Sequence, residues 1–276
     1  MITITGSIAE SRLYLHTGIT LAGALCLYDA GNPASYPGTG VTWFNLITSG
    51  TTVGNAIKQG SQVSQGWPRW DSRGWFNFLG GTSVGDNFSR FDFSFPQLNN
   101  VSMFVWYRNR VEPLISGEDP FNIQQHVMRS ANSTDTDSSY QILITAGNGI
   151  GMCIANSYFP GVNSSSVNTM NGEWHQIVGT RQSSNDEQVL YFDGVRIGSL
   201  IASGQIPKAG TMRIGSRNDT YSNHFYGSIA MVGMYQRVLT AAEVYNNYLT
   251  MVKRLNRPDY NIGLFPQGDP TRYYER

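Results

Sequence analysis

Four stretches of the chain have hydrophobic patterns typical of β-strands. Apolar and polar side chains alternate in residues 75–78 and 91–95, which predicts strands with one buried face. Residues 24–29 and 101–107 are almost continuously apolar, as expected for strands covered on both faces. These patterns predict a core built mainly from β-strands.

Turn residues divide the second half of the chain into hairpins. Gly147-Asn148-Gly149 separates residues 141–146 from 150–155, and Asp193-Gly194 separates 189–192 from 195–197. Asp-Gly favours the positive φ angles of a two-residue type I′ turn, so the second hairpin is the clearer prediction. Further strands are expected at residues 174–181, 211–214 and 228–235.

One helix is predicted near the end of the chain. Thr240 and Glu243 have the spacing of a capping box, and Leu239 and Val244 that of a hydrophobic staple. Lys253 and Arg254 follow at the C-terminal end, where basic residues are favoured. The expected apolar face consists of Val244, Tyr245, Tyr248, Leu249 and Val252. Many short strands and one late helix predict an all-β, antiparallel two-sheet sandwich.

The remaining segments lack periodicity. Residues 1–20 are expected to form an N-terminal arm, residues 21–254 the β domain and residues 255–276 an extended tail. Residues 108–139 form the longest stretch without a pattern, and a loop of that length is usually functional or an insertion.

An ordered series of short motifs resembles the laminin-G-like jelly-roll family of the concanavalin A-like fold. The motifs are Gly172-Glu173-Trp174-His175-Gln176-Ile177-Val178, Leu190-Tyr191-Phe192-Asp193-Gly194, Arg213-Ile214-Gly215, Gly227-Ser228-Ile229-Ala230 and residues 235–244. Residues 27–38, together with Trp43, are similar to the opening of such domains in tailed-bacteriophage virion proteins. The resemblance implies a jelly-roll sandwich and a place in a virion, made in the host cytoplasm.

Composition narrows the partners. The chain has 19 basic and 19 acidic residues, so it lacks the basic excess of a nucleic-acid binder, and association between copies meets little repulsion. The apolar run at residues 19–28 is too short to span a bilayer. No export signal is recognised, and Cys26 and Cys153 are expected to be unpaired core thiols.

None of the motifs that could be catalytic has the structural context that catalysis would require. Residues 81–85 match Gly-x-Ser-x-Gly, but the following residues predict a strand and not the helix that a nucleophile elbow needs. The acidic pairs Glu118/Asp119, Asp135/Asp137 and Asp186/Glu187 fall in predicted loops, away from the strand face that a glycosidase would use. His126 and His224 are also expected in loops, with His175 at the border of the core. The chain is therefore predicted not to be an enzyme.

Two groups of residues are candidates for ligand binding. Laminin-G-like jelly rolls often bind Ca²⁺ through oxygen ligands at an edge of the sandwich. The resemblance implies that the ligands here would come from Asp86, Asn87, Asn218 and Asp219. No other cofactor is expected. A sugar ring could be contacted by Trp67, Arg69 and Trp70. The alternative is that the aromatic cluster packs in the core, and this is favoured; the cluster consists of Trp67, Trp70, Trp75 and Phe76.

Two functions remain. The first is a capsid decoration or cement protein, which binds the major capsid protein or another virion protein. Its tail would be anchored by Tyr260, Phe265, Tyr273 and Tyr274, and copies would form a homo-oligomer, for example a trimer. The alternative is a fibre or adsorption module that binds a host surface glycan through residues 108–139 and 215–226.

Overall fold

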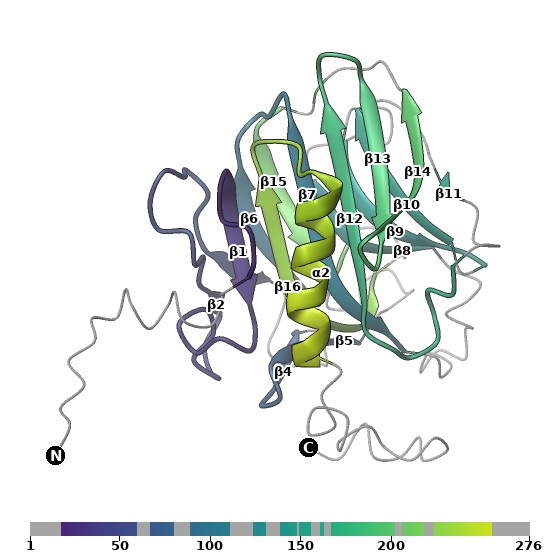
Figure 1. The fold of residues 1–276 in the computed structure, drawn as a ribbon. Helices are drawn as coiled ribbons and strands as arrows, with labels where there is room; N and C mark the ends of the chain where they lie inside the picture. The colour runs from purple at the N-terminus through teal and green to yellow at the C-terminus, as the bar shows by residue number, and fades with distance from the viewer. Residues whose placement is uncertain are drawn as a thin grey trace, which may run out of the picture.

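The computed structural model describes most of the predicted β domain. The described residues are 18–59, 67–79, 89–110, 124–130, 139–147, 149–155, 161–162, 167–201, 206, 208–217 and 224–255. They form two antiparallel sheets packed face to face, with one helix on the outer side of one sheet (Figure 1). The predicted sandwich with a late helix is confirmed.

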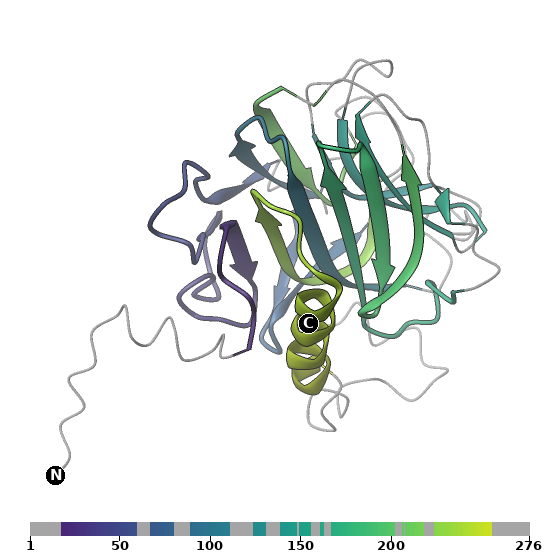
Figure 2. The ribbon, with the colours of Figure 1, turned by 45° about the horizontal axis from the view of Figure 1, so that its top comes forward.

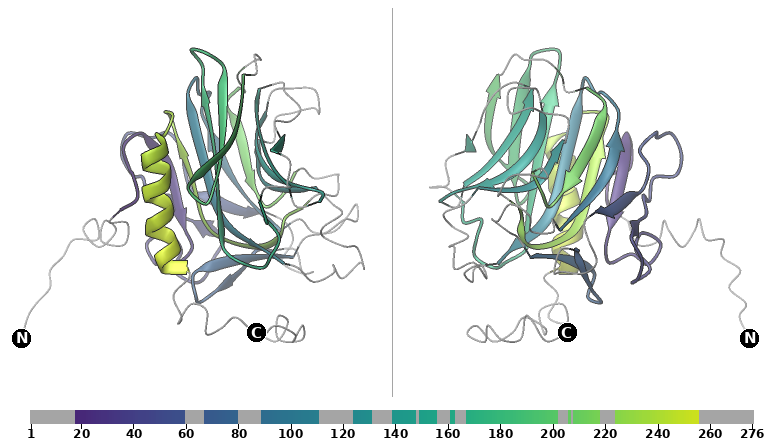
Figure 3. Two further views of the ribbon diagram at one scale, coloured as in Figure 1. Left: turned by 45° about the vertical axis from the view of Figure 1, so that its right-hand side comes forward. Right: turned by 180° about the vertical axis from the view of Figure 1, so that it is seen from behind.

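The first sheet, sheet A, lies between the helix and the second sheet (Figure 3). In the described part of the chain it has eight strands. Along the sheet they are β14 (Val195–Ile201), β13 (Glu187–Phe192), β12 (His175–Gln182), β7 (Val101–Asn109), β16 (Tyr226–Tyr235), β5 (Trp75–Leu79) and β4 (Arg69–Asp71). The eighth strand, β1 (Ala24–Asp29), pairs with the C-terminal half of β16, on the same side as β5.

Sheet B forms the other layer and, among the described residues, also has eight strands. Their order is β11 (Gly161–Val162), β10 (Gly149–Ala155), β9 (Ser139–Thr145), β8 (Gln125–Ser130), β15 (Gly210–Ile214), β6 (Arg90–Phe95), β3 (Ala56–Gln59) and β2 (Thr42–Trp43). Viewed with its top turned forward, the sandwich shows both sheets curving alongside each other (Figure 2). Strands distant in the sequence are thus neighbours in both sheets.

Strand β7 shows how the sequence builds two cores. Val105 and Tyr107 point into the main core between the sheets, whereas Phe104 and Trp106 point into a second cluster beneath the helix. Both faces of β7 are therefore buried, which explains its continuous apolar sequence. In β6, only alternate residues, Phe91, Phe93 and Phe95, enter the core.

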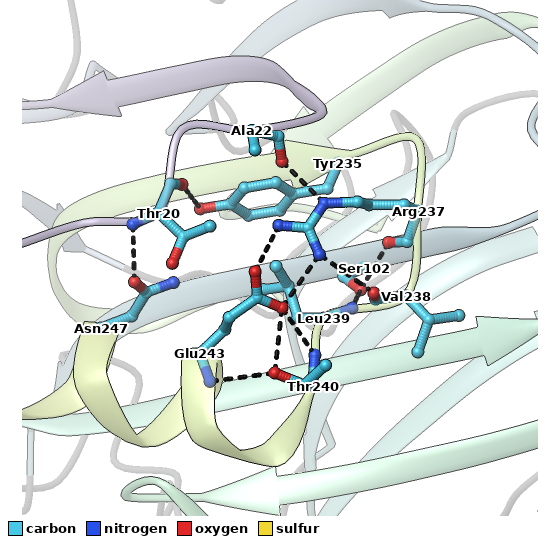
Figure 4. A network of polar contacts seen from close by, with 10 residues as sticks. All are labelled: Thr20, Ala22, Ser102, Tyr235, Arg237, Val238, Leu239, Thr240, Glu243 and Asn247. Carbon is cyan, nitrogen blue, oxygen red and sulfur yellow. Dashed lines mark hydrogen bonds and ion pairs between the residues drawn. The ribbon is translucent and has the colours of Figure 1, made fainter.

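The helix α2 (Ala241–Leu255) begins with the predicted capping box. The Glu243 amide donates to Thr240 Oγ1 at 3.2 Å, and the Thr240 amide donates to Glu243 Oε2 at 2.9 Å (Figure 4). Arg237 extends the network by donating to both Glu243 carboxylate oxygens and to the carbonyl of Ala22. This network joins the helix start to the segment that precedes β1.

The buried face of α2 differs from the predicted one. It consists of Val244, Asn247, Met251 and Leu255, while Tyr245 is exposed. Asn247 is buried because its Oδ1 accepts a hydrogen bond from the Thr20 amide at 2.8 Å. A polar residue with a specific partner therefore occupies a position that hydrophobicity alone assigned to solvent.

The end of α2 is held by a buried carboxylate. Arg254 donates from both terminal nitrogens to the two Asp29 carboxylate oxygens at 2.6 Å each. Asp29 ends β1 and is fully buried. The ion pair consequently ties the last turn of the helix to the edge of sheet A.

Three predictions about local structure can be compared directly with the structure. Asp193 and Gly194 have φ angles of 48° and 79°, which confirms a type I′ turn between β13 and β14. The prediction that residues 108–139 are irregular was wrong in part, because β7 continues to Asn109 and β8 spans Gln125–Ser130. All six β8 residues are buried although four are polar, so polarity concealed the strand. Cys26 and Cys153 are buried and form no disulfide with each other, as predicted.

Candidate functional site

The structure separates the three residues that were proposed to contact a sugar. In the short strand β4, Arg69 is exposed whereas Trp70 packs against the main core. The Trp70 indole nitrogen donates to the Ala30 carbonyl at 3.0 Å, and its ring contacts Tyr36. Trp67 is half-buried near the Lys58 side chain. Strand alternation therefore removes Trp70 from any shared surface with Arg69.

The other candidate residues lie outside the described residues. These are the tail residues Tyr260, Phe265, Tyr273 and Tyr274, the calcium candidates Asp86, Asn87, Asn218 and Asp219, and the motif at residues 81–85. The corresponding proposals stay predictions. Within the described ranges, no group of three or more His, Cys, Asp or Glu side chains is arranged to hold a metal ion. The same ranges contain no helix long and apolar enough to cross a membrane.

The outer face of sheet B carries a feature that the sequence analysis missed. Asp92 of β6 is paired with Arg213 of β15, Arg213 with Arg129 of β8, and Arg129 with Gln141 of β9. Directly paired residues on antiparallel strands project on the same face with Cβ atoms about 5 Å apart. We call these four residues the polar row.

The core residues establish on which side the polar row lies. Phe91 and Phe93 flank Asp92, and Met212 and Ile214 flank Arg213, and all four belong to the main core. Because successive residues of a strand point to opposite faces, the polar row must project away from sheet A. Asp92, Gln141 and Arg213 are half-buried, whereas Arg129 is buried, with 6% of its surface exposed.

The charge of this face is mainly positive. Among the described side chains that project outward from the sheet B strands, Arg90, Arg129 and Arg213 are basic and Asp92 is acidic. The Arg90 Nε atom lies 3.0 Å from Asp92 Oδ1, so this carboxylate is already engaged. Arg129 and Arg213 are directly paired, so their guanidinium groups come from neighbouring positions and one anion could contact both.

Two histidines that were expected in loops lie near Arg129. His126 lies in β8, so that expectation was wrong for it, whereas His224 lies outside the strands and makes an isolated bridge to His126. The His224 Nδ1 atom is 2.9 Å from Ser216 Oγ. His126 is 1% exposed, and neither of its ring nitrogens has a hydrogen-bond partner among the described residues.

Burial determines the protonation of His126. Burial lowers the pKa of His126 well below its usual range, and the charges of Arg129 and Arg217 and the neighbouring His224 lower it further. His126 is therefore neutral, with one donor and one acceptor nitrogen. Its neutral ring leaves the arginines as the positive charges there.

This arrangement suits a polar ligand with many oxygen atoms. Guanidinium groups donate in a planar fork to carboxylates, while the Gln141 amide and the Asp92 carboxylate can accept from hydroxyl groups. A pattern of single polar residues between core residues was visible in the sequence at Asp92 and Arg213. The pairing that places them side by side was not.

The fold and this face define an all-β sandwich of the jelly-roll class. Residues 97–245 match the family model of the concanavalin A-like lectin/glucanases superfamily. The chain therefore belongs to this superfamily, and the predicted laminin-G-like resemblance is confirmed at that level. The bacteriophage virion context stays a prediction.

Solved structures of distant proteins share the fold. A Trypanosoma rangeli sialidase in complex with sialic acid is 12% identical, with a TM-score of 0.59 over 89% of this chain and 37% of that chain. The botulinum neurotoxin type G receptor-binding domain is 15% identical, with a TM-score of 0.55 over 83% of this chain and 51% of that chain. This chain thus spans between a third and about half of these proteins' lengths. A comparison with curated protein sequences gives no match.

Proposed function

We propose that this protein is a glycan-binding module and that its ligand lies on the outer face of sheet B. The observation that carries the proposal is the polar row, in which four strands contribute hydrogen-bonding side chains to one surface. Rigid strands hold such groups more exactly than loops do. Binding, without a chemical step, is the activity that this arrangement supports.

The excess of arginine favours a sugar that carries a carboxylate. Arg129 and Arg213 lie side by side, and a carboxylate placed between them would receive charge-assisted hydrogen bonds from both. Hydroxyl groups of the same ligand would reach Gln141 on one side and Asp92 on the other. Uronic and sialic acids combine both kinds of group in one ring.

The structural neighbours are compatible with this proposal. The Trypanosoma rangeli sialidase was solved with sialic acid, and the neurotoxin domain is a receptor-binding domain. At 12% and 15% identity they support the fold as a scaffold for binding sugars or receptors, and the choice of ligand rests on the polar row.

A glycan array followed by calorimetry tests the proposal. The wild-type protein should bind carboxylated sugars, and Arg213→Gln should weaken binding at least about tenfold, since a hydrogen bond to a charged group contributes roughly 1.5–3 kcal/mol. Arg69→Gln is the matched control, because it removes the same charge from an exposed position on sheet A. Equal losses in the two variants, or no saturable binding to any sugar, would refute the proposal.

The capsid-decoration hypothesis remains a separate prediction. It depends on the two terminal segments, which lie outside the described residues apart from residues 18–20 and Leu255. If the protein stabilises virus particles and loses that effect when residues 256–276 are deleted, the hypothesis gains support. Unchanged stabilisation by the truncated protein would remove its basis.

A further inference from the structure

A lysine lies among aromatic rings at the edge of the main core. In β3, Ile57 is paired with Asp92 and therefore projects outward, so the next residue, Lys58, points inward between the sheets. The Lys58 Nζ atom lies over four aromatic rings. The distances to their centroids are 5.1 Å for Tyr36, 5.3 Å for Phe76, 5.7 Å for Trp67 and 5.9 Å for Phe91.

The hydrogen bonding of this amine is sparse. Lys58 Nζ donates to Tyr36 Oη at 2.9 Å, and Tyr36 donates its own hydroxyl proton to the Gly40 carbonyl at 2.8 Å. The Tyr36 oxygen can therefore serve Lys58 only as an acceptor. No carboxylate among the described residues forms an ion pair with Lys58, unlike Arg90, which pairs with Asp92.

These surroundings make the amine available for chemistry. Burial lowers the pKa of Lys58 to about 8, because water is removed from the ammonium group and no carboxylate of the described part of the chain replaces it. The ring faces attract a cation, which opposes the shift without cancelling it. A large fraction of Lys58 is thus a neutral amine near pH 8, and a desolvated neutral lysine is a nucleophile for carbonyl compounds.

We propose that Lys58 is a covalent capture site for small aldehydes, with the four rings forming the cage that holds the product. The Lys58 Nζ lone pair adds to the aldehyde carbon and forms a carbinolamine. Loss of water then gives the imine, and protonation of the imine nitrogen gives an iminium cation. No oxidant or reductant is required. The iminium is a weakly hydrated cation, which ring faces stabilise at close range.

The small number of lysines makes the test direct. The chain contains Lys58, Lys208 and Lys253, and the last two are exposed. The folded protein would be treated at pH 8 with a limiting amount of glycolaldehyde and sodium cyanoborohydride, and each lysine-containing peptide would be quantified by mass spectrometry. The α-amino group of Met1 is scored on its own peptide. We expect Lys58 to be labelled at least about fivefold faster than Lys208 and Lys253.

Two controls identify the cause of the selectivity. In urea-unfolded protein the three lysines should react at similar rates, since the cage is then absent. In the folded state, Trp67→Glu should slow labelling of Lys58 by placing a carboxylate near the amine, while Trp67→Gln removes the ring without adding charge and should slow it less. Circular dichroism establishes that both variants are folded.

Three results would overturn the proposal. Labelling of Lys58 no faster than that of the exposed lysines would show that the amine is protonated or inaccessible. Preference for Lys58 in the unfolded chain would assign it to local sequence. Equal labelling in Trp67→Glu and Trp67→Gln would exclude control by charge. None of these results bears on glycan binding, which concerns the opposite face of sheet B.

Discussion

The ion pair between Asp29 and Arg254 allows the energetics of this fold to be tested sharply. Asp29 is fully buried at the end of β1, and the Arg254 side chain, 21% exposed, covers it from the last turn of α2. Replacing Arg254 with methionine preserves much of the side-chain volume and removes both donors. The Asp29 carboxylate would then remain buried with the Gly31 amide, at 2.9 Å, as a donor.

The expected cost follows from burial. Breaking a buried ion pair by removing one partner typically costs about 3–5 kcal/mol, because the remaining charge is left uncompensated. The Gly31 hydrogen bond persists, so we expect the lower end, about 3 kcal/mol, for Arg254→Met. The measurement is the free energy of unfolding in urea at pH 7, with an unchanged slope against urea as the condition for comparing variants.

A control pair of similar chemistry isolates the contribution of burial. Arg196 and Glu187 form an ion pair at 3.0 Å between neighbouring strands, with side chains 53% and 35% exposed. Arg196→Met should cost less than about 1 kcal/mol, as exposed pairs do. Asp29→Asn should recover part of the loss when combined with Arg254→Met. If Arg254→Met costs no more than Arg196→Met, or if the Asp29 and Arg254 substitutions are additive, the reasoning is refuted.

Two further predictions concern the start of α2 and the contact between the two sheets at Gly179 and Met152. Arg237 holds the pKa of the Glu243 carboxyl down to about 2, so its stabilising effect is complete above the unfolded-state pKa near 4.5 and is lost as the pH falls towards 2. In urea titrations, the difference in the free energy of unfolding between wild type and Glu243→Gln should therefore be constant from pH 7 to 5 and become smaller below pH 5. A difference that stays constant down to pH 2.5 would contradict this prediction. A Cβ added at Gly179 would overlap Met152 Sδ, so Gly179→Ala should lower the free energy of unfolding by about 1–3 kcal/mol. Adding Met152→Ala should reverse part of that loss in a double-mutant cycle.

The sequence was sufficient for features that one segment specifies by itself. The turn at Asp193-Gly194 needs only two residues that accept positive φ, and the capping box of α2 needs only Thr240 and Glu243. The apolar run of β7 likewise predicted a strand covered on both faces, and the two cores supply that cover. Local physics is readable wherever the interacting groups are close in the chain.

The failures involve polar residues whose partners are remote in the sequence. Asn247 enters the buried face of α2 because Thr20, at the other end of the domain, supplies a donor for its amide oxygen. Strand β8 was missed because Gln125 and His126 have the polarity of a loop, yet Gln125 Oε1 accepts from the Tyr226 amide at 2.9 Å. A pattern of hydrophobicity assigns polar groups to water unless the distant donor or acceptor is known.

The same limit explains why the polar row was not predicted as a binding site, whereas Trp67, Arg69 and Trp70 were predicted to contact a ligand. Aromatic residues grouped in sequence are easily taken for a binding platform, but strand alternation sends Arg69 and Trp70 to opposite faces. The row is the reverse case, because Asp92 and Arg213 are each a single polar residue between core residues and look like ordinary solvent-facing positions. Only the insertion of β15 between β6 and β8 brings Arg213 beside both Asp92 and Arg129. In a sandwich whose strand order differs from chain order, a binding face is a property of the pairing, and its residues are found by following the register across the sheet.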